Sequence, residues 1–261
     1  MHRGLSSSLA LGAALLTTTL VASGCGDEDS AAGDRGEVVV SAATSLKSAF
    51  TSYGEQFTAA EAQFSFAGSD ELAAQIRSGA RPDVFAAANT KLPDALFEEG
   101  LVERPQVFAS NRLVLAVSAK STKVKTLDDL TTKGITIVIG AESVPIGAYT
   151  RKVLGGLAAA ARAGILANVR SNEPDVGGIA AKLTQGAGDA GFLYATDVVA
   201  TSGRLKAIEL PVDLQPDVAY GIAVVKGAEH RSEAQAFVAG LLDGAGADAL
   251  DSAGFKPLPV K

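Results

Sequence analysis

Short apolar runs alternate with amphipathic stretches along most of the chain. Residues 38–40 form a β-branched run of strand length, and residues 41–45 make a small, hydroxyl-rich turn. After this turn the apolar residues recur at helical spacing and share one face of a helix: Leu46, Ala49, Phe50, Tyr53 and Phe57. The pattern predicts a strand, a turn and a helix, with the folded domain starting near Glu37.

The same succession of strand and helix continues downstream. The pattern predicts, in chain order, strand 63–66, helix 69–78, strand 84–87, helix 91–99, strand 135–139, helix 147–162, helix 175–185, strand 190–194, strand 206–210, strand 218–225 and helix 233–253. Alternating strands and helices are typical of an α/β fold.

The N-terminal segment has the features of an export signal. A positive start containing Arg3 precedes an apolar stretch at residues 9–22 that is too short to span a bilayer. Small residues then precede Cys25, as in the bacterial lipobox, although Ala22 stands where Leu is usual. The sequence predicts a signal peptide at residues 1–24, a lipid on Cys25 and a flexible tether at residues 25–36; a buried helix with a chance cysteine is the alternative.

Composition narrows the function classes. The chain is 47% hydrophobic and 20% charged, as globular proteins are, and its net charge is −6. An acidic protein lacks the Lys and Arg needed to displace counterions from nucleic acid. Aromatic residues make up only 5% and Trp is absent, so base-stacking platforms are scarce. We expect no nucleic-acid partner.

Few residues could carry metal or nucleophilic chemistry. The histidines are His2 and His230, and the single cysteine is Cys25. These are too few for a zinc site, and His230 lies in a polar run unsuited to a catalytic triad. The alternative function is that of a hydrolase, and only carboxylates remain to catalyse its reaction. The carboxylates near predicted strand ends are Asp70, Asp83, Asp175 and Asp197. We expect no enzyme activity, no cofactor and no bare metal ion.

Two strand–helix junctions place hydroxyl groups at helix starts. Ligands of α/β proteins bind beyond the carboxyl ends of strands, where helix N-termini favour anions. The first junction covers residues 41–46 and the second residues 66–72, and both contain serine. Helix capping would explain either junction alone, but two in succession favour an anion site.

Three later junctions add backbone and phenol donors. Pro145 and Gly147 flank Ile146 in a tight turn that can present the Ile146 N–H to a ligand. The same residues are equally consistent with a plain connecting loop. Asp175 is suited to cap the next helix, which leaves Val176 in its first turn. Tyr194 ends a strand, where its ring could also pack at the edge of the core.

Several motifs together resemble those of the periplasmic molybdate-binding proteins, the solute receptors of ABC importers. The resemblance covers about residues 37–260 and rests on these segments in order: Ala-Ala-Thr-Ser-Leu from Ala42, Phe-Ala-Gly-Ser-x-x-Leu-Ala from Phe66, Pro-Asp-Val-Phe-Ala-Ala-Ala from Pro82, Val-Pro-x-Gly from Val144, and Asp-Ala-Gly-Phe-Leu-Tyr-Ala-Thr-Asp from Asp189. Each segment is weak alone, but the ordered set is specific.

The resemblance implies a ligand set. In that family, two serine hydroxyls with neighbouring amides, two further backbone amides and one tyrosine hydroxyl hold the oxyanion. Matched motif by motif, the implied residues are Ser45, Ser69, Ile146, Val176 and Tyr194. The implied function is the capture of molybdate, and of tungstate, for delivery to the permease and ATPase of an importer. The implied location is the outer face of the cytoplasmic membrane, with the protein a monomer held by lipid on Cys25.

The resemblance also implies the architecture, a two-lobed type II periplasmic binding protein fold. Each lobe is a mixed sheet flanked by helices, and the ligand binds in the cleft between them. We expect the first lobe at residues 37–115, the second at residues 116–214 and a return to the first at residues 215–261. With donors on both lobes, the ligand favours a closed form reached by hinge motion.

Three positions depart from the family pattern. Thr44 stands where Ala is usual and adds a hydroxyl near the site, and Ile146 is bulkier than the usual residue. Asp70 follows Ser69 where a hydroxyl residue is common, and we expect its carboxylate to face solvent as a first-turn acid. If it pointed inward it would favour a receptor for protonated phosphate; sulfate or an organic anion is a further alternative cargo.

Overall fold

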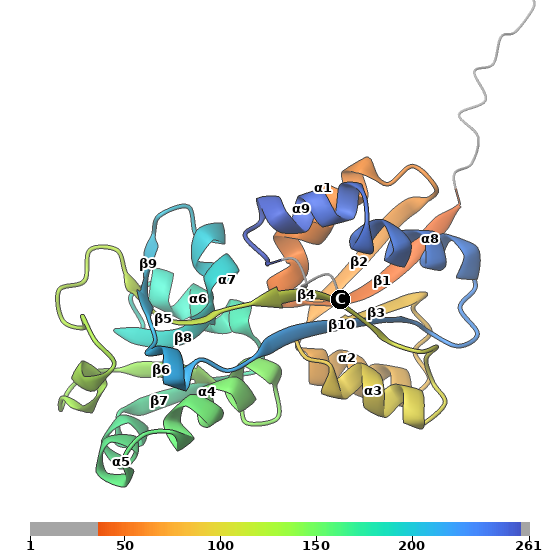
Figure 1. Cartoon of the computed structure of the whole chain (residues 1–261). Coiled ribbons are helices and arrows are strands. Elements are labelled where there is room, and N and C mark those ends of the chain that lie inside the picture. The colour runs from red at the N-terminus through yellow and green to blue at the C-terminus, as the bar shows by residue number, and fades with distance from the viewer. Residues whose placement is uncertain (1–35, 257–261) are drawn as a thin grey trace, which may run out of the picture. The chain divides into compact units, whose positions relative to one another are not determined.

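The computed structural model describes residues 36–256, and their strands form two five-stranded sheets (Figure 1). The described residues belong to one compact unit. The predicted signal peptide, the lipid site at Cys25 and residues 25–35 of the predicted tether lie outside the described residues. Within the described range, no helix is long and apolar enough to cross a membrane.

The first lobe is built on a mixed sheet with strand order β2-β1-β3-β10-β4. β1 pairs in parallel with β2 and β3, whereas β10 runs antiparallel to β3 and β4. Its elements are β1 (Glu37–Ala43), a 3-10 turn (Thr44–Leu46), α1 (Lys47–Gln56), β2 (Glu61–Ala67), α2 (Ser69–Arg77), β3 (Val84–Ala87), α3 (Lys91–Glu98), β4 (Gln106–Asn111), β10 (Val218–Val224), α8 (Arg231–Leu242) and α9 (Ala245–Ser252).

The second lobe has the strand order β7-β6-β8-β5-β9. β6 is parallel to β7 and β8, and β5 is antiparallel to β8 and β9. Its elements are β5 (Leu113–Ser118), a 3-10 turn (Asp128–Thr131), β6 (Ile137–Gly140), α4 (Pro145–Gly155), α5 (Ala159–Ala167), β7 (Val169–Glu173), α6 (Val176–Thr184), β8 (Ala190–Tyr194), α7 (Ala195–Ala200), β9 (Leu205–Glu209) and a 3-10 turn (Val212–Leu214). The two mixed sheets with flanking helices are the predicted α/β architecture.

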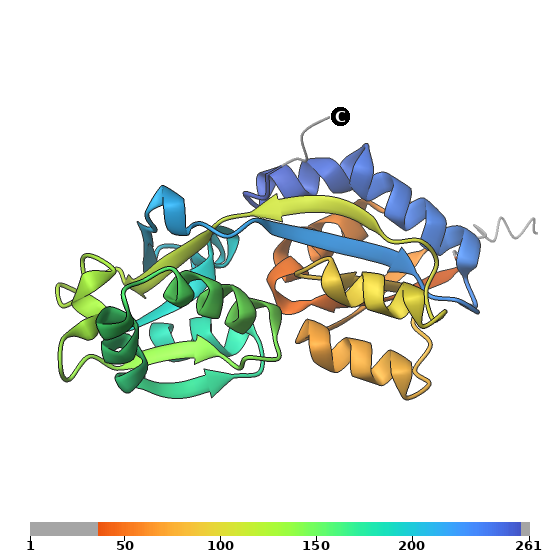
Figure 2. The ribbon, with the colours of Figure 1, turned by 60° about the horizontal axis from the view of Figure 1, so that its bottom comes forward.

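Two neighbouring segments join the lobes (Figure 2). β4 ends at Asn111 in the first sheet and β5 begins at Leu113 in the second, so the chain crosses at Arg112. It returns after Leu214 and enters β10, which pairs with β4. The expected boundary at residue 115 therefore falls inside β5, because that strand pairs with β8 and β9 from its first residues onward.

The first helix has the buried face that its spacing predicts. Leu46, Ala49, Phe50 and Tyr53 are all buried, and Phe50 packs edge-on against Phe237 with ring centroids 5.6 Å apart. Phe237 belongs to α8, so this contact packs α1 against α8. The Phe50 ring also lies 6.2 Å from that of Phe64 in β2 and 6.0 Å from that of Phe108 in β4, which holds α1 on the sheet.

Two predicted helices are each broken in the structure. The expected helix 147–162 is α4 followed by α5, because Gly155 and Gly156 disfavour helix and Gly156 approaches Leu214 too closely for a side chain. The expected helix 233–253 is α8 followed by α9. Gly244 separates them with φ of +119°, a conformation that other residues rarely adopt.

Three strands were not predicted, namely β4, β5 and β7. β7 alternates between exposed and more buried positions and carries the polar residues Arg170, Ser171 and Asn172. It lies at the edge of its sheet, where such residues face water. Its place matters because α6 begins just beyond it.

Candidate functional site

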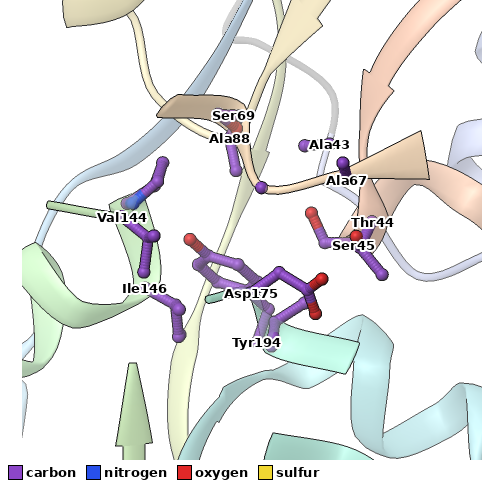
Figure 3. A pocket seen from close by; sticks show the side chains of 13 residues that line it. Ala43, Thr44, Ser45, Ala67, Ser69, Ala88, Val144, Ile146, Asp175 and Tyr194 are labelled. Atoms are coloured by element: carbon purple, nitrogen blue, oxygen red, sulfur yellow. Dashed lines mark hydrogen bonds between the residues drawn. The ribbon is translucent and has the colours of Figure 1, made fainter. Parts of the chain in front are cut away.

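A small pocket between the lobes contains all five predicted ligand residues (Figure 3). The first lobe contributes Ala43, Thr44, Ser45, Ala67, Gly68, Ser69 and Ala88, and the second contributes Val144, Pro145, Ile146, Asp175, Val176 and Tyr194. The pocket has a volume of about 20 Å³, whereas a cavity for one water needs roughly 10–15 Å³. A small inorganic ion fits this space, and a sugar or a peptide does not.

The five residues come together because each follows the end of a strand. Ser45 lies in the turn after β1, and Ser69 is the first residue of α2. Ile146 and Val176 lie in the first turns of α4 and α6, and Tyr194 precedes α7. The first N–H groups of a helix have no carbonyl partner within the helix, and the helix dipole makes this end positive. The pocket is therefore surrounded by groups that favour an anion.

Both serine hydroxyls already accept a hydrogen bond from the protein. The Ala88 N–H donates to Ser69 Oγ over 3.1 Å, and the Tyr220 hydroxyl donates to Ser45 Oγ over 3.1 Å. A hydroxyl has one proton to donate, so both serines keep theirs for a ligand. Sequence reasoning missed Tyr220, whose only local sign is a phenol within an apolar strand.

Two further hydroxyls are enclosed without a partner among the described residues. They are Tyr194 Oη and Thr44 Oγ1, and both residues line the pocket. In Figure 3 the Tyr194 hydroxyl points into the space between Ser69 and Val144. Burial raises the pKa of Tyr194 well above its usual value, so the phenol keeps its proton. A buried, unpaired donor is costly unless a ligand satisfies it.

Asp175 is the one charged side chain among the described residues that line the pocket. Its Oδ1 accepts a hydrogen bond from the Gly178 N–H over 3.0 Å, which confirms the predicted cap of α6. The cap occupies an acceptor of the carboxylate and leaves the Val176 N–H without a partner in its own helix.

The expectation that Asp70 faces solvent is wrong for one of its carboxylate oxygens. Oδ1 is buried and has no hydrogen-bond partner among the described residues, although Asp70 does not line the pocket. The reason is close packing against the other lobe: a Cβ atom on Gly68 would lie 2.6 Å from the Pro174 carbonyl oxygen and 3.0 Å from Asp70 Oδ1. The Asp70 carboxylate therefore does not face the pocket that the hydrogen-bond donors surround.

Two further carboxylates near strand ends, Asp83 and Asp197, lie outside the pocket. Asp83 is buried and accepts hydrogen bonds from the N–H groups of Val39 and His230. Asp197 accepts from the Tyr194 N–H at 3.3 Å, and burial raises its pKa to about 7. Neither lines the pocket, which leaves Asp175 alone there. Over residues 36–256 no three His, Cys, Asp or Glu side chains gather as metal ligands do.

Comparisons with known proteins agree with this geometry. Residues 38–256 match the family described as bacterial extracellular solute-binding protein. The chain is 36% identical to the molybdate-binding protein ModA of Mycobacterium tuberculosis, over 97% of both chains. It is 29% identical to ModA of Escherichia coli, over 74% of this chain and 79% of that one. The periplasmic molybdate-binding protein of Azotobacter vinelandii shares the fold, with a TM-score of 0.77, 21% identity, and coverage of 85% and 100%.

Proposed function

The chain belongs to the bacterial extracellular solute-binding protein family, and we propose that it captures molybdate and delivers it to an ABC importer. The 36% identity to a molybdate-binding protein over nearly the whole length supports this ligand. The resemblance of the five motifs points to the same class.

The observation that carries the proposal is the enclosed Tyr194 hydroxyl. It has no partner among residues 36–256, and it shares the pocket with Ser45 and Ser69, whose protons remain free. Hydrogen bonds to an ion contribute roughly 1.5–3 kcal/mol each. Three or four such donors account for the roughly 8 kcal/mol of a micromolar site. No lysine or arginine is needed, and none of the described residues that line the pocket is a lysine or an arginine.

The donor set favours a fully ionised anion. Molybdate and tungstate carry no proton near neutral pH and require only donors, whereas protonated phosphate also needs an acceptor. Asp70 does not line the pocket, and Asp175 already accepts from Gly178. Sulfate is smaller and cannot reach all the donors at once. We therefore propose tungstate as a second ligand and rank sulfate, phosphate and organic anions below both.

Binding couples to closure because the donors belong to both lobes. Ser45 and Ser69 come from the first lobe, and Ile146, Val176 and Tyr194 come from the second. An ion that contacts both sets stabilises the closed arrangement over an open one. The importer then distinguishes loaded from empty receptor by the shape of the closed form.

The remaining parts of the proposal concern location and activity. A lipid on Cys25 would hold the receptor at the outer face of the membrane, and the tether would leave it free to reach the permease. We propose a monomer that binds without turnover, since Asp175 is the one carboxylate among the described residues that line the pocket and its Oδ1 caps α6.

Calorimetric titration of the purified protein with molybdate tests the proposal. We expect one site per chain with micromolar or tighter affinity. Absence of binding, or tighter binding of phosphate, would contradict it.

A further inference from the structure

Tyr220 lies beneath the pocket without lining it. It belongs to β10, one of the segments that join the lobes, and its side chain is fully buried. Its hydroxyl lies 3.1 Å from Ser45 Oγ, and its ring meets that of Tyr194 edge-on with centroids 5.8 Å apart. One side chain therefore contacts a proposed ligand residue from each lobe.

The hydrogen bonds around Tyr220 have a direction. Asn111 Oδ1 accepts from the Arg112 N–H at 2.8 Å, and Asn111 Nδ2 donates to Thr196 Oγ1 at 2.9 Å. These bonds engage both polar atoms of the Asn111 side chain. Among the described residues, the Tyr220 hydroxyl has one hydrogen bond, which it donates to Ser45 Oγ.

The phenol keeps that proton at any physiological pH. Burial and the nearby Asp197 charge raise the pKa of Tyr220 well above its usual value. The neutral phenol donates its proton to Ser45 Oγ, which leaves the Ser45 proton for another acceptor. The pocket is the space that its hydroxyl faces in Figure 3.

We infer that Tyr220 is a positioning residue for anion binding, which orients the Ser45 proton into the pocket from a strand that joins the lobes. The inference rests on the proposed function. It extends the site to the hydrogen-bonded pair Tyr220–Ser45, which connects β10 with the turn after β1.

The test is a double-mutant cycle measured by molybdate titration. Tyr220→Phe removes the hydroxyl and keeps the ring, and we expect affinity to fall about five- to tenfold. In a Ser45→Ala background the same change should have little further effect, because the group that it orients is gone. A residue that serves only the fold would weaken binding equally in both backgrounds.

Tyr53→Phe is the matched control. Its buried hydroxyl donates to the Phe237 carbonyl at 3.1 Å within the first lobe, away from the pocket. Removing it should leave molybdate affinity unchanged. Circular dichroism and thermal unfolding establish that each variant is folded at the titration temperature. If Tyr220→Phe does not fold, Tyr220→Met fills the space without a hydroxyl and serves in the same cycle.

The outcomes separate the two claims. A parent protein that does not bind molybdate overturns the proposed function, and the inference with it. A parent that binds, together with a Tyr220→Phe variant of equal affinity or of equal loss in both backgrounds, overturns the inference alone.

Discussion

The Ala88 N–H donates a hydrogen bond to the Ser69 hydroxyl over 3.1 Å, although the two residues are 19 positions apart in the chain. Ser69 is the first residue of α2 and follows β2, and Ala88 follows β3, so the contact joins the ends of the two strands that flank β1. The bond occupies an acceptor site of the hydroxyl and leaves its proton for the pocket. Ser45 has the same arrangement with Tyr220 as donor.

Removal of either serine hydroxyl should weaken binding. We expect Ser45→Ala and Ser69→Ala each to cost roughly 1.5–3 kcal/mol of molybdate binding, since each loses a hydrogen bond to an ion. Titration calorimetry measures the loss, and circular dichroism checks the fold. If both variants keep the affinity of the parent, the serines are not ligand residues.

A backbone donor can be tested at Val176, the first residue of α6. Val176→Pro deletes the N–H where proline suits a helix, and Asp175 before it has the extended conformation that proline requires. We expect the fold to survive and binding to fall by roughly 1.5–3 kcal/mol. Val176→Ala keeps the N–H and should bind normally. A proline variant that binds like the parent, or an alanine variant that does not, refutes the role of this amide.

Anion selectivity should follow ionisation and size. The neutral donors are fixed at helix starts in both lobes, so molybdate and tungstate should bind far more tightly than sulfate or phosphate. Competition calorimetry with the four anions gives the order. Similar affinities for molybdate, tungstate and sulfate would show that the pocket does not select by size.

The pH dependence of stability should contain a contribution from His230. Its Nδ1 lies 3.1 Å from Asp83 Oδ2, and this hydrogen bond raises the pKa of His230 above its usual 6.5. A pKa raised in the folded state stabilises the protein below about pH 6.5, and this contribution is lost as pH rises through the folded pKa. Urea unfolding at pH 5.5 and 8.5 should show a smaller difference in His230→Gln than in the parent. An equal difference in both proteins would exclude the contribution.

Membrane attachment should depend on Cys25. We expect Cys25→Ser to give an unprocessed precursor or to release the protein from the membrane fraction, because the acylated residue is lost. Fractionation and immunoblotting of cells that express each form measure this. Normal processing with full membrane retention of the variant would rule out the lipid anchor.

Local patterns in the sequence were sufficient to predict how the site residues begin their helices. Asp175 caps α6 as predicted, and Ser69 starts α2 after an apolar strand. Capping and strand-to-helix turns depend on neighbouring residues, so the sequence carries them directly. The family resemblance supplied the choice of Ser45, Ser69, Ile146, Val176 and Tyr194 as one set, which no spacing rule joins.

Contacts between distant residues could not be predicted in this way. Tyr220 and Ser45 are 175 positions apart, and their hydrogen bond depends on how β10 inserts beside β3 and β4. The buried oxygen of Asp70 likewise depends on the other lobe packing against Gly68. The break at Gly244 was missed because a positive φ depends on how α9 turns back against α1 and α8.

A crystal structure of the protein grown with molybdate, with molybdenum located by its anomalous scattering, tests the central claim most directly. We predict one molybdenum peak in the pocket, with ligand oxygens about 3 Å from Ser45 Oγ, Ser69 Oγ, the Ile146 and Val176 nitrogens and Tyr194 Oη. A peak elsewhere, or an ordered crystal with no molybdenum in the pocket, would contradict the account.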